Sequence, residues 1–214
     1  MSLALAVCNK NGIVVSTDVC TTITLTDPDT NKIVEEWHDN FAQKSYLTKQ
    51  GHAVAFTGAG ELDNKQKTHI VILDLLKISD MMLMSVKEEL DFLLRELSAR
   101  TSKNIVYLID AAIEDGNNII LHTDTSSKIV HPNIGIDYAV ASGMHDVYAE
   151  EFHKGNYDIS NMDFSDMVDF VKKMTALTAH KYDSVSEEVD LIVIDDTESY
   201  RVTEIPRQPY IVDP

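Results

Sequence analysis

The hydrophobic pattern of the first sixty residues is that of β-strands. Residues 2–8 and 12–18 alternate or run apolar and are rich in Val and Ile, and the letters NKNG between them are a hairpin signal. Residues 21–44 carry an Asp27-Pro28-Asp29 turn between two β-prone runs, which predicts a longer hairpin, and residues 45–60 return to strand character. The first block of the chain is therefore predicted to be mostly sheet.

The spacing of apolar residues then becomes helical. From Leu62 to Met84 they surround a helix on nearly all sides. A second, amphipathic helix begins at Val86 behind a capping box of Ser85 and Glu88, with apolar positions at Leu90, Leu93, Leu94 and Leu97. A third helix is predicted from about Asp163 to Tyr182, with one apolar face made of Met167, Phe170, Val171, Met174 and Leu177.

Further strands lie between and after these helices. Residues 104–113 and 117–124 form a predicted hairpin, residues 137–143 another strand, and residues 189–195 and 199–205 a last pair around a short turn. Antiparallel pairs joined by short turns favour sheets with helices layered outside them, so the predicted fold class is α+β. We expect one domain over residues 1–214, with residues 21–43 as an extended hairpin insertion.

Composition restricts the class of protein. The chain has 214 residues, of which 44% are hydrophobic, enough for one sizeable core. Eighteen Lys and Arg stand against 35 Asp and Glu, a net charge of −17 that repels phosphate, so nucleic-acid and anionic-membrane partners are not expected. No basic leader precedes the first strand and no apolar run reaches the roughly 18 residues of a membrane span, which predicts a cytoplasmic protein. Cys8 and Cys20 are expected to be reduced thiols.

The common catalytic and metal-binding motifs are absent from the sequence. There is no Gly-rich phosphate loop, no Gly-x-Ser-x-Gly elbow and no His-Glu-x-x-His, and the eight histidines lack metal-ligand spacing, so neither a cofactor nor a metal is predicted. Five histidines are interpreted as surface or turn residues: His38, His52, His122, His131 and His145.

One candidate for chemistry is the second residue. If Met1 is removed, Ser2 offers both a hydroxyl and an α-amine, and an amine with a pKa near 8 is a usable general base at neutral pH. Nucleophilic catalysis without histidine then becomes possible, on a residue that a β-strand holds rigidly. While Met1 is attached, the amine is acylated and this base does not exist.

Four segments occur in an order that resembles a known family. They are SLALAVCNKNGIVVSTD, which ends at Asp18, AQKSYLTKQGHAVAFTGAG with Lys44 and Gly58, AVASGM with Ser142, and YDSVSEEVDLIVI with Asp183 and Ser186. Together they resemble the β-type subunits of the proteasome, including the bacterial HslV-type peptidase, within the N-terminal nucleophile hydrolases. The similarity runs over roughly residues 2–196, and the spacing from Lys44 to Gly58 fits without a gap.

The resemblance implies a four-layer αββα fold and an N-terminal serine- or threonine-type peptidase or amidase. Ser2 would be the nucleophile, Lys44 would favour loss of its hydroxyl proton and lower the pKa of the α-amine, and Asp18 would keep Lys44 charged. A polar cluster of Ser142, Asp183 and Ser186 would position the α-amine. The Gly58 N–H would bind the oxyanion.

The resemblance also implies features of substrate binding and assembly. The walls of the first specificity pocket would include Thr21, Ala42, Tyr46, Phe56 and Gly60. Peptide or amide substrates, a homo-oligomeric ring of six or seven subunits and an ATP-dependent unfoldase partner are the expected partners.

Two departures from the family pattern leave alternatives open. The family usually carries threonine where this chain has Ser2, and small residues often stand where this chain has Glu187 and Glu188. A non-catalytic subunit of the same fold that serves only assembly is the alternative to an enzyme. Another alternative is that Met1, Ser2 and Leu3 derive from an expression-vector leader, in which case the native second residue is a different one.

Overall fold

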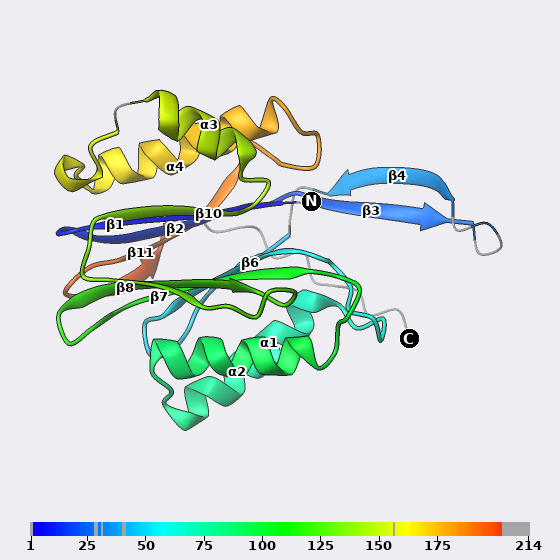
Figure 1. Ribbon diagram of the computed structural model, residues 1–214, viewed down its shortest axis with the longest axis horizontal. Coiled ribbons are helices and arrows are strands. Elements are labelled where there is room, and N and C mark those ends of the chain that lie inside the picture. Colours follow the sequence, from blue (N-terminus) through cyan, green and yellow to red (C-terminus); the bar gives the residue numbers. More distant parts are fainter. Residues whose placement is uncertain (1, 28–29, 31, 40–41, 156, 203–214) are drawn as a thin grey trace.

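The computed structural model describes residues 2–27, 30, 32–39, 42–155 and 157–202. Two five-stranded sheets lie face to face at its centre (Figure 1). All neighbouring strands within each sheet are antiparallel. The predicted α+β class is therefore confirmed.

The first sheet contains the N-terminal strand. Its order is β10-β1-β2-β11-β12. The strands are β1 (Leu3–Asn9), β2 (Gly12–Asp18), β10 (Tyr138–Gly143), β11 (Val189–Ile194) and β12 (Ser199–Arg201).

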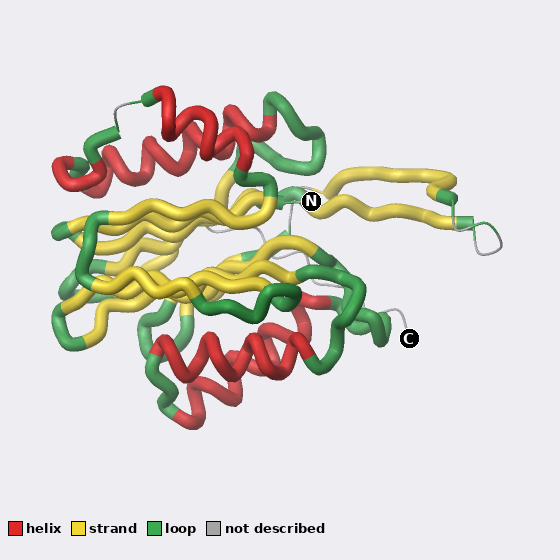
Figure 2. Tube along the Cα trace, in the orientation of Figure 1, coloured by secondary structure: helices red, strands yellow, loops and turns green. Residues whose placement is uncertain are grey.

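The second sheet contains the strand that follows Lys44. Its order is β5-β6-β7-β8-β9. The strands are β5 (Ser45–Leu47), β6 (Ala53–Gly58), β7 (Val106–Glu114), β8 (Asn117–Asp124) and β9 (His131–Ile134). A separate hairpin of β3 (Thr21–Thr26) and β4 (Ile33–Asp39) projects from the body of the molecule (Figure 2).

Helices cover the outer faces of both sheets. Helices α3 (Asp146–Lys154) and α4 (Phe164–Ala179) lie on the first sheet, and α1 (Thr68–Met82) and α2 (Val86–Ser98) lie on the second, so the layers run helix, sheet, sheet, helix (Figure 1). A single 3₁₀ turn, Ile159–Asn161, precedes α4. None of the helices in the described part of the chain combines the length and apolarity that crossing a membrane requires.

Strand β1 shows why the N-terminal sequence is apolar on both sides. Alternate residues of a strand point to opposite faces. Leu3, Leu5 and Val7 belong to the core under α4, whereas Ala4 and Ala6 belong to the core between the two sheets. Both faces are buried, so the strand reads as a nearly continuous hydrophobic run. The small alanines on the inner face let the two sheets approach closely.

The first helix is shorter than its apolar pattern predicts. The prediction began it at Leu62, but α1 begins at Thr68, because residues 61–67 form a loop closed by a bridge between Glu61 and Lys67. Lys65, with φ of 67°, has a left-handed backbone that a helix does not allow. Leu62 is buried nevertheless, which explains why it fits the apolar pattern.

Other predicted elements agree within a few residues. The capping box of Ser85 and Glu88 begins α2 as predicted. The prediction missed α3 and β9, and on α4 the buried face includes Thr178 while Leu177 is only half-buried. Of the predicted turn at residues 27–29, positions 28–29 lie outside the described residues, as do positions 203–205 of the last predicted strand.

Cys8 leads to a first prediction. Its thiol lies between the sheets, and burial raises the pKa of Cys8 to about 11. Because the thiolate is the reactive form, we expect less than about 1% modification of Cys8 by iodoacetamide in one hour at pH 8 in folded protein, and complete modification in urea. Peptide mass spectrometry measures both. Equal labelling of Cys8 under the two conditions would contradict the buried position.

Candidate active site

The Lys44 ammonium group lies at the point where three chain segments meet. Its Nζ donates a hydrogen bond to Ser2 Oγ at 2.8 Å and forms an ion pair with Asp18 Oδ2 at 2.9 Å. A third hydrogen bond goes to the Cys20 carbonyl oxygen. Ser2, Asp18 and Lys44 are all buried, with 7%, 0% and 5% of their surface exposed. The start of β1, the end of β2 and the residue before β5 thus share one polar centre.

Lys44 Nζ has one oxygen partner for each donor of an ammonium group. An ammonium group has three N–H donors and no acceptor, and the partners here are Ser2 Oγ, Asp18 Oδ2 and the Cys20 carbonyl oxygen. Lys44 carries the positive charge in its ion pair with the Asp18 carboxylate. A charged ammonium stabilises negative charge on Ser2 Oγ but has no lone pair to accept the hydroxyl proton. The base that receives that proton must be another group.

Asp18 also fixes the backbone that carries Ser2. Its Oδ1 accepts the Leu3 N–H at 2.8 Å, and its Oδ2 accepts the Cys20 N–H at 3.0 Å. On the other side, the Ser2 carbonyl accepts the Met144 N–H at 3.0 Å. Both ends of the peptide unit that joins Ser2 to Leu3 are therefore anchored, which restricts the position of the serine hydroxyl.

Two glycines border this centre. A methyl group at Gly143 would overlap the Ser2 carbonyl oxygen and would come within 2.8 Å of Thr57 Oγ1. Thr57 precedes Gly58, which is the last residue of β6 and has φ of 98°. A side chain at Gly58 would overlap the Ile105 carbonyl oxygen. The backbone of both glycines therefore approaches its neighbours more closely than other residues allow.

Strand geometry gives the direction of the Gly58 N–H. The Phe56 N–H donates to the Lys44 carbonyl oxygen at 3.0 Å. N–H groups two residues apart on a strand point to the same edge, so the Gly58 N–H is directed to the edge of β6 on which Lys44 lies. Since β5 begins only at Ser45, this N–H lies beyond the strand pairing, as a donor for a negatively charged oxygen must.

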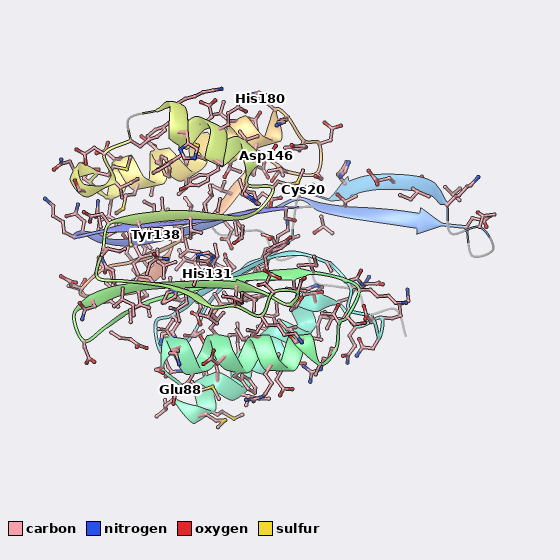
Figure 3. All side chains as sticks on the ribbon, viewed as in Figure 1. Cys20, Glu88, His131, Tyr138, Asp146 and His180 are labelled. Atoms are coloured by element: carbon pink, nitrogen blue, oxygen red, sulfur yellow. The ribbon has the colours of Figure 1, made fainter. Side chains whose placement is uncertain are left out.

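Two segments beside the centre are tied together by Asp146. Its Oδ2 accepts hydrogen bonds from Lys181 Nζ at 2.7 Å and from the Tyr182 hydroxyl at 2.6 Å. The Lys181 ammonium, with Tyr182, lowers the pKa of Asp146 to about 2. In Figure 3 the labels of Asp146 and Cys20 stand near each other, and Cys20 Sγ lies 3.9 Å from the carbonyl oxygen of Asp183, which follows Tyr182. The start of α3 and the loop after α4 are thereby held next to each other.

The predicted amine-positioning cluster is only partly assembled around Ser2. Ser186 is buried, accepts the Val19 N–H at 3.0 Å and donates to the Glu188 carbonyl at 2.9 Å. Ser142 is buried opposite Ala4 in the β1–β10 pairing. The Asp183 side chain is exposed. Within the described residues, no hydrogen bond joins any of these three side chains to Ser2, so their role at a free α-amine stays a prediction.

The residues predicted to line a specificity pocket lie in different surroundings. Tyr46 and Phe56 are buried with their rings nearly parallel, at a centroid distance of 6.3 Å. Both belong to the core under α1 and α2. Thr21 and Ala42 are half-buried, and Gly60 is exposed. The Ala42 N–H donates to the Val19 carbonyl, which keeps Ala42 beside the end of β2.

Sequence reasoning missed two contributors to the centre. The Cys20 carbonyl and the Met144 N–H were not singled out as functional. Both act through backbone atoms, which every residue type provides, so no residue pattern could identify them. Gly143 stood in the quoted Ser-Gly pair, and its close contact with Ser2 explains why a glycine is needed there.

Comparison with models of protein families gives no match to this chain, and comparison with curated proteins gives none either.

Proposed function

We propose that the protein is a proteasome-like N-terminal nucleophile hydrolase that cleaves peptide or amide bonds with Ser2 after removal of Met1. The fold would then be the four-layer αββα sandwich of that class. The observation that carries the proposal is the hydrogen bond from Lys44 Nζ to Ser2 Oγ, in a buried site where Asp18 keeps the lysine charged.

The reaction follows from the groups at the centre. Ser2 Oγ attacks the carbonyl carbon, and its proton passes to the Ser2 α-amine, because Lys44 is already an ammonium ion. The resulting oxyanion accepts the Gly58 N–H, and the Lys44 charge stabilises it further. The C–N bond breaks as the protonated amine gives its proton to the leaving nitrogen. Water, deprotonated by the same amine, then hydrolyses the ester and restores Ser2.

Intact mass spectrometry of untagged protein tests the proposal. We expect the mass of the chain to lack Met1, and treatment with a peptide epoxyketone to add one equivalent of reagent. An epoxyketone reacts with both the hydroxyl and the α-amine of one residue, so peptide mapping should locate the adduct on Ser2. A Ser2→Ala variant is the control, since it keeps the amine but loses the nucleophile.

The alternative function gives a different result. A non-catalytic assembly subunit would form no adduct even when Met1 is absent. Retention of Met1 together with failure of proteolytically trimmed protein to react would reject the enzyme. The assay therefore separates an inert protein from one that awaits removal of its first residue.

Assembly into a homo-oligomeric ring, with an unfoldase that delivers substrate, belongs to the same proposal. Support comes from α1, whose outer face exposes large apolar side chains that water solvates poorly. They are Ile70, Leu73, Ile78, Met81 and Met82, followed by Leu83.

A further inference from the structure

A second buried polar cluster lies in the other half of the molecule. His52 precedes β6, Glu89 lies on α2, and Asp110 lies in the middle of β7 on the face covered by α2. A ring nitrogen of His52 and one carboxylate oxygen from each acid all lie within 4.8 Å of one another. Their exposed fractions are 5%, 0% and 0%. The prediction that His52 is a surface or turn residue is confirmed for its backbone, which closes the turn before β6, but its side chain is buried and does not lie on the surface.

Two of the three side chains have partial partners. His52 Nδ1 lies 3.1 Å from Glu89 Oε1, and the Ser79 hydroxyl donates to Glu89 Oε2. On the far side of the imidazole, Nε2 faces Glu114 Oε1 at 3.8 Å. Because the imidazole lies between two acids, it is oriented with one nitrogen towards the cluster and the other towards Glu114.

Asp110 is the exception. Neither of its carboxylate oxygens makes a hydrogen bond of normal geometry with any residue that the structure describes. The Ala111 N–H and the Glu89 carboxyl group are among its polar neighbours. A fully buried carboxylate without a hydrogen-bond donor is costly, and a positively charged partner would remove that cost.

The charges of the cluster also favour a bound cation. Burial, together with the neighbouring Glu89 and Glu114, raises the pKa of Asp110 well above its usual range. Ionised together, Glu89 and Asp110 would place two negative charges in the core, with a third from Glu114 at its edge. A protonated His52 neutralises only one of them. One divalent cation neutralises both fully buried acids while His52 stays neutral and serves as a ligand.

We propose that His52, Glu89 and Asp110 bind one divalent first-row transition-metal ion, of the class of Zn²⁺ or Mn²⁺, as a structural site between α2 and the second sheet. This inference is independent of the proposed hydrolase activity. An imidazole with two carboxylates suits these ions better than Mg²⁺ or Ca²⁺, which favour oxygen alone.

The dimensions of the cluster fit such an ion. Ligand atoms at about 2.1 Å from a tetrahedral metal lie about 3.4 Å apart. Atoms within 4.8 Å of one another need to move by about 0.7 Å or less per residue to coordinate one ion. Glu114, facing His52 Nε2, would orient the imidazole as outer-shell carboxylates commonly do at metal sites.

The site would connect three elements that are distant in sequence. His52 enters β6, which leads to Gly58, and Asp110 lies opposite Val54 of β6 in the sheet. Glu89 fixes α2 to this sheet, with Ser79 adding α1. Closed sites of this kind stabilise a fold, because the ion holds segments that would otherwise separate.

Metal analysis of the folded, full-length protein tests the inference. Protein expressed in media supplemented separately with Zn²⁺, Mn²⁺ or Co²⁺, and purified without an affinity tag, is examined by native mass spectrometry and elemental analysis. We expect about one ion per chain with at least one of the three metals. Asp110→Asn and His52→Gln should each lower the metal content at least about tenfold. His122→Gln, a half-buried histidine outside the cluster, is the matched control and should retain the ion.

X-ray absorption at the metal edge keeps the test valid if the variants do not fold, because it reads the ligands in the parent protein. One imidazole with oxygen ligands is expected, whereas sulfur ligands or several imidazoles would overturn the assignment. Folded parent protein without metal after all three supplementations would also overturn it. The acids would then share protons instead, and Asp110→Asn would leave stability unchanged or raise it.

Discussion

Lys44→Met is expected to lower the rate of epoxyketone adduct formation by about a thousand-fold, the scale typical of losing one charged group that acts in the transition state. Methionine keeps most of the length of the side chain but removes the hydrogen bond to Ser2 Oγ and the charge beside it. Intact mass spectrometry over time measures the rate on protein that lacks Met1. Lys154→Met, at an exposed ion pair on α3, is the control and should react like the parent.

The single variant also leaves Asp18 buried without its cation, which is expected to cost roughly 3–5 kcal/mol in the free energy of unfolding. The double variant Asp18→Asn/Lys44→Met removes both charges and should recover much of that loss. If it folds and still reacts slowly, Lys44 acts on the reaction and not only on stability. A folded double variant with the parent's rate would contradict the assigned role of Lys44.

The sequence predicts most strands because burial of both strand faces leaves a nearly continuous run of apolar residues. In β1 and β2 both faces are covered, so nearly every side chain is apolar, and a two-residue turn at Lys10 and Asn11 separates them. The beginning of α1 could not be predicted from such a pattern, since Leu62 is buried by a loop as completely as it would be by a helix. The apolar pattern indicates only that a residue such as Leu62 is buried. The local backbone geometry is needed to show whether a loop or a helix buries it.

The sequence could predict which side chains belong to the candidate site, but not that they meet in space. Asp18, Lys44 and Ser2 could be named from the resemblance, but their meeting depends on two sheets packing face to face, which no local pattern states. The same limit explains His52, Glu89 and Asp110. Each stands in a different element, and the spacing of 37 and 21 residues between them has no meaning until β6, β7 and α2 are assembled.

Gly143→Ala is expected to disable the site through the backbone alone. The glycine has φ of 85°, a conformation that costs other residues about 1–2 kcal/mol, and the added methyl group would overlap the Ser2 carbonyl oxygen. With the steric term included, we expect a loss of about 2–4 kcal/mol in the free energy of unfolding, measured by urea titration. Relief of the overlap must displace Ser2, so adduct formation should slow at least about tenfold.

Gly116→Ala separates the strain of the backbone from the contact with Ser2. Gly116 has a similar φ of 73°, in the turn between β7 and β8, and a methyl group there meets no atom within 4 Å. This variant should lose only about 1 kcal/mol and react at the parent rate. The excess effect of Gly143→Ala then measures how strongly the Ser2 carbonyl must be held for the hydroxyl to stay within reach of Lys44. Equal reactivity of the two variants would show that the position of Ser2 does not depend on Gly143, and the anchoring of its peptide unit would have to come from Asp18 and the Met144 N–H alone.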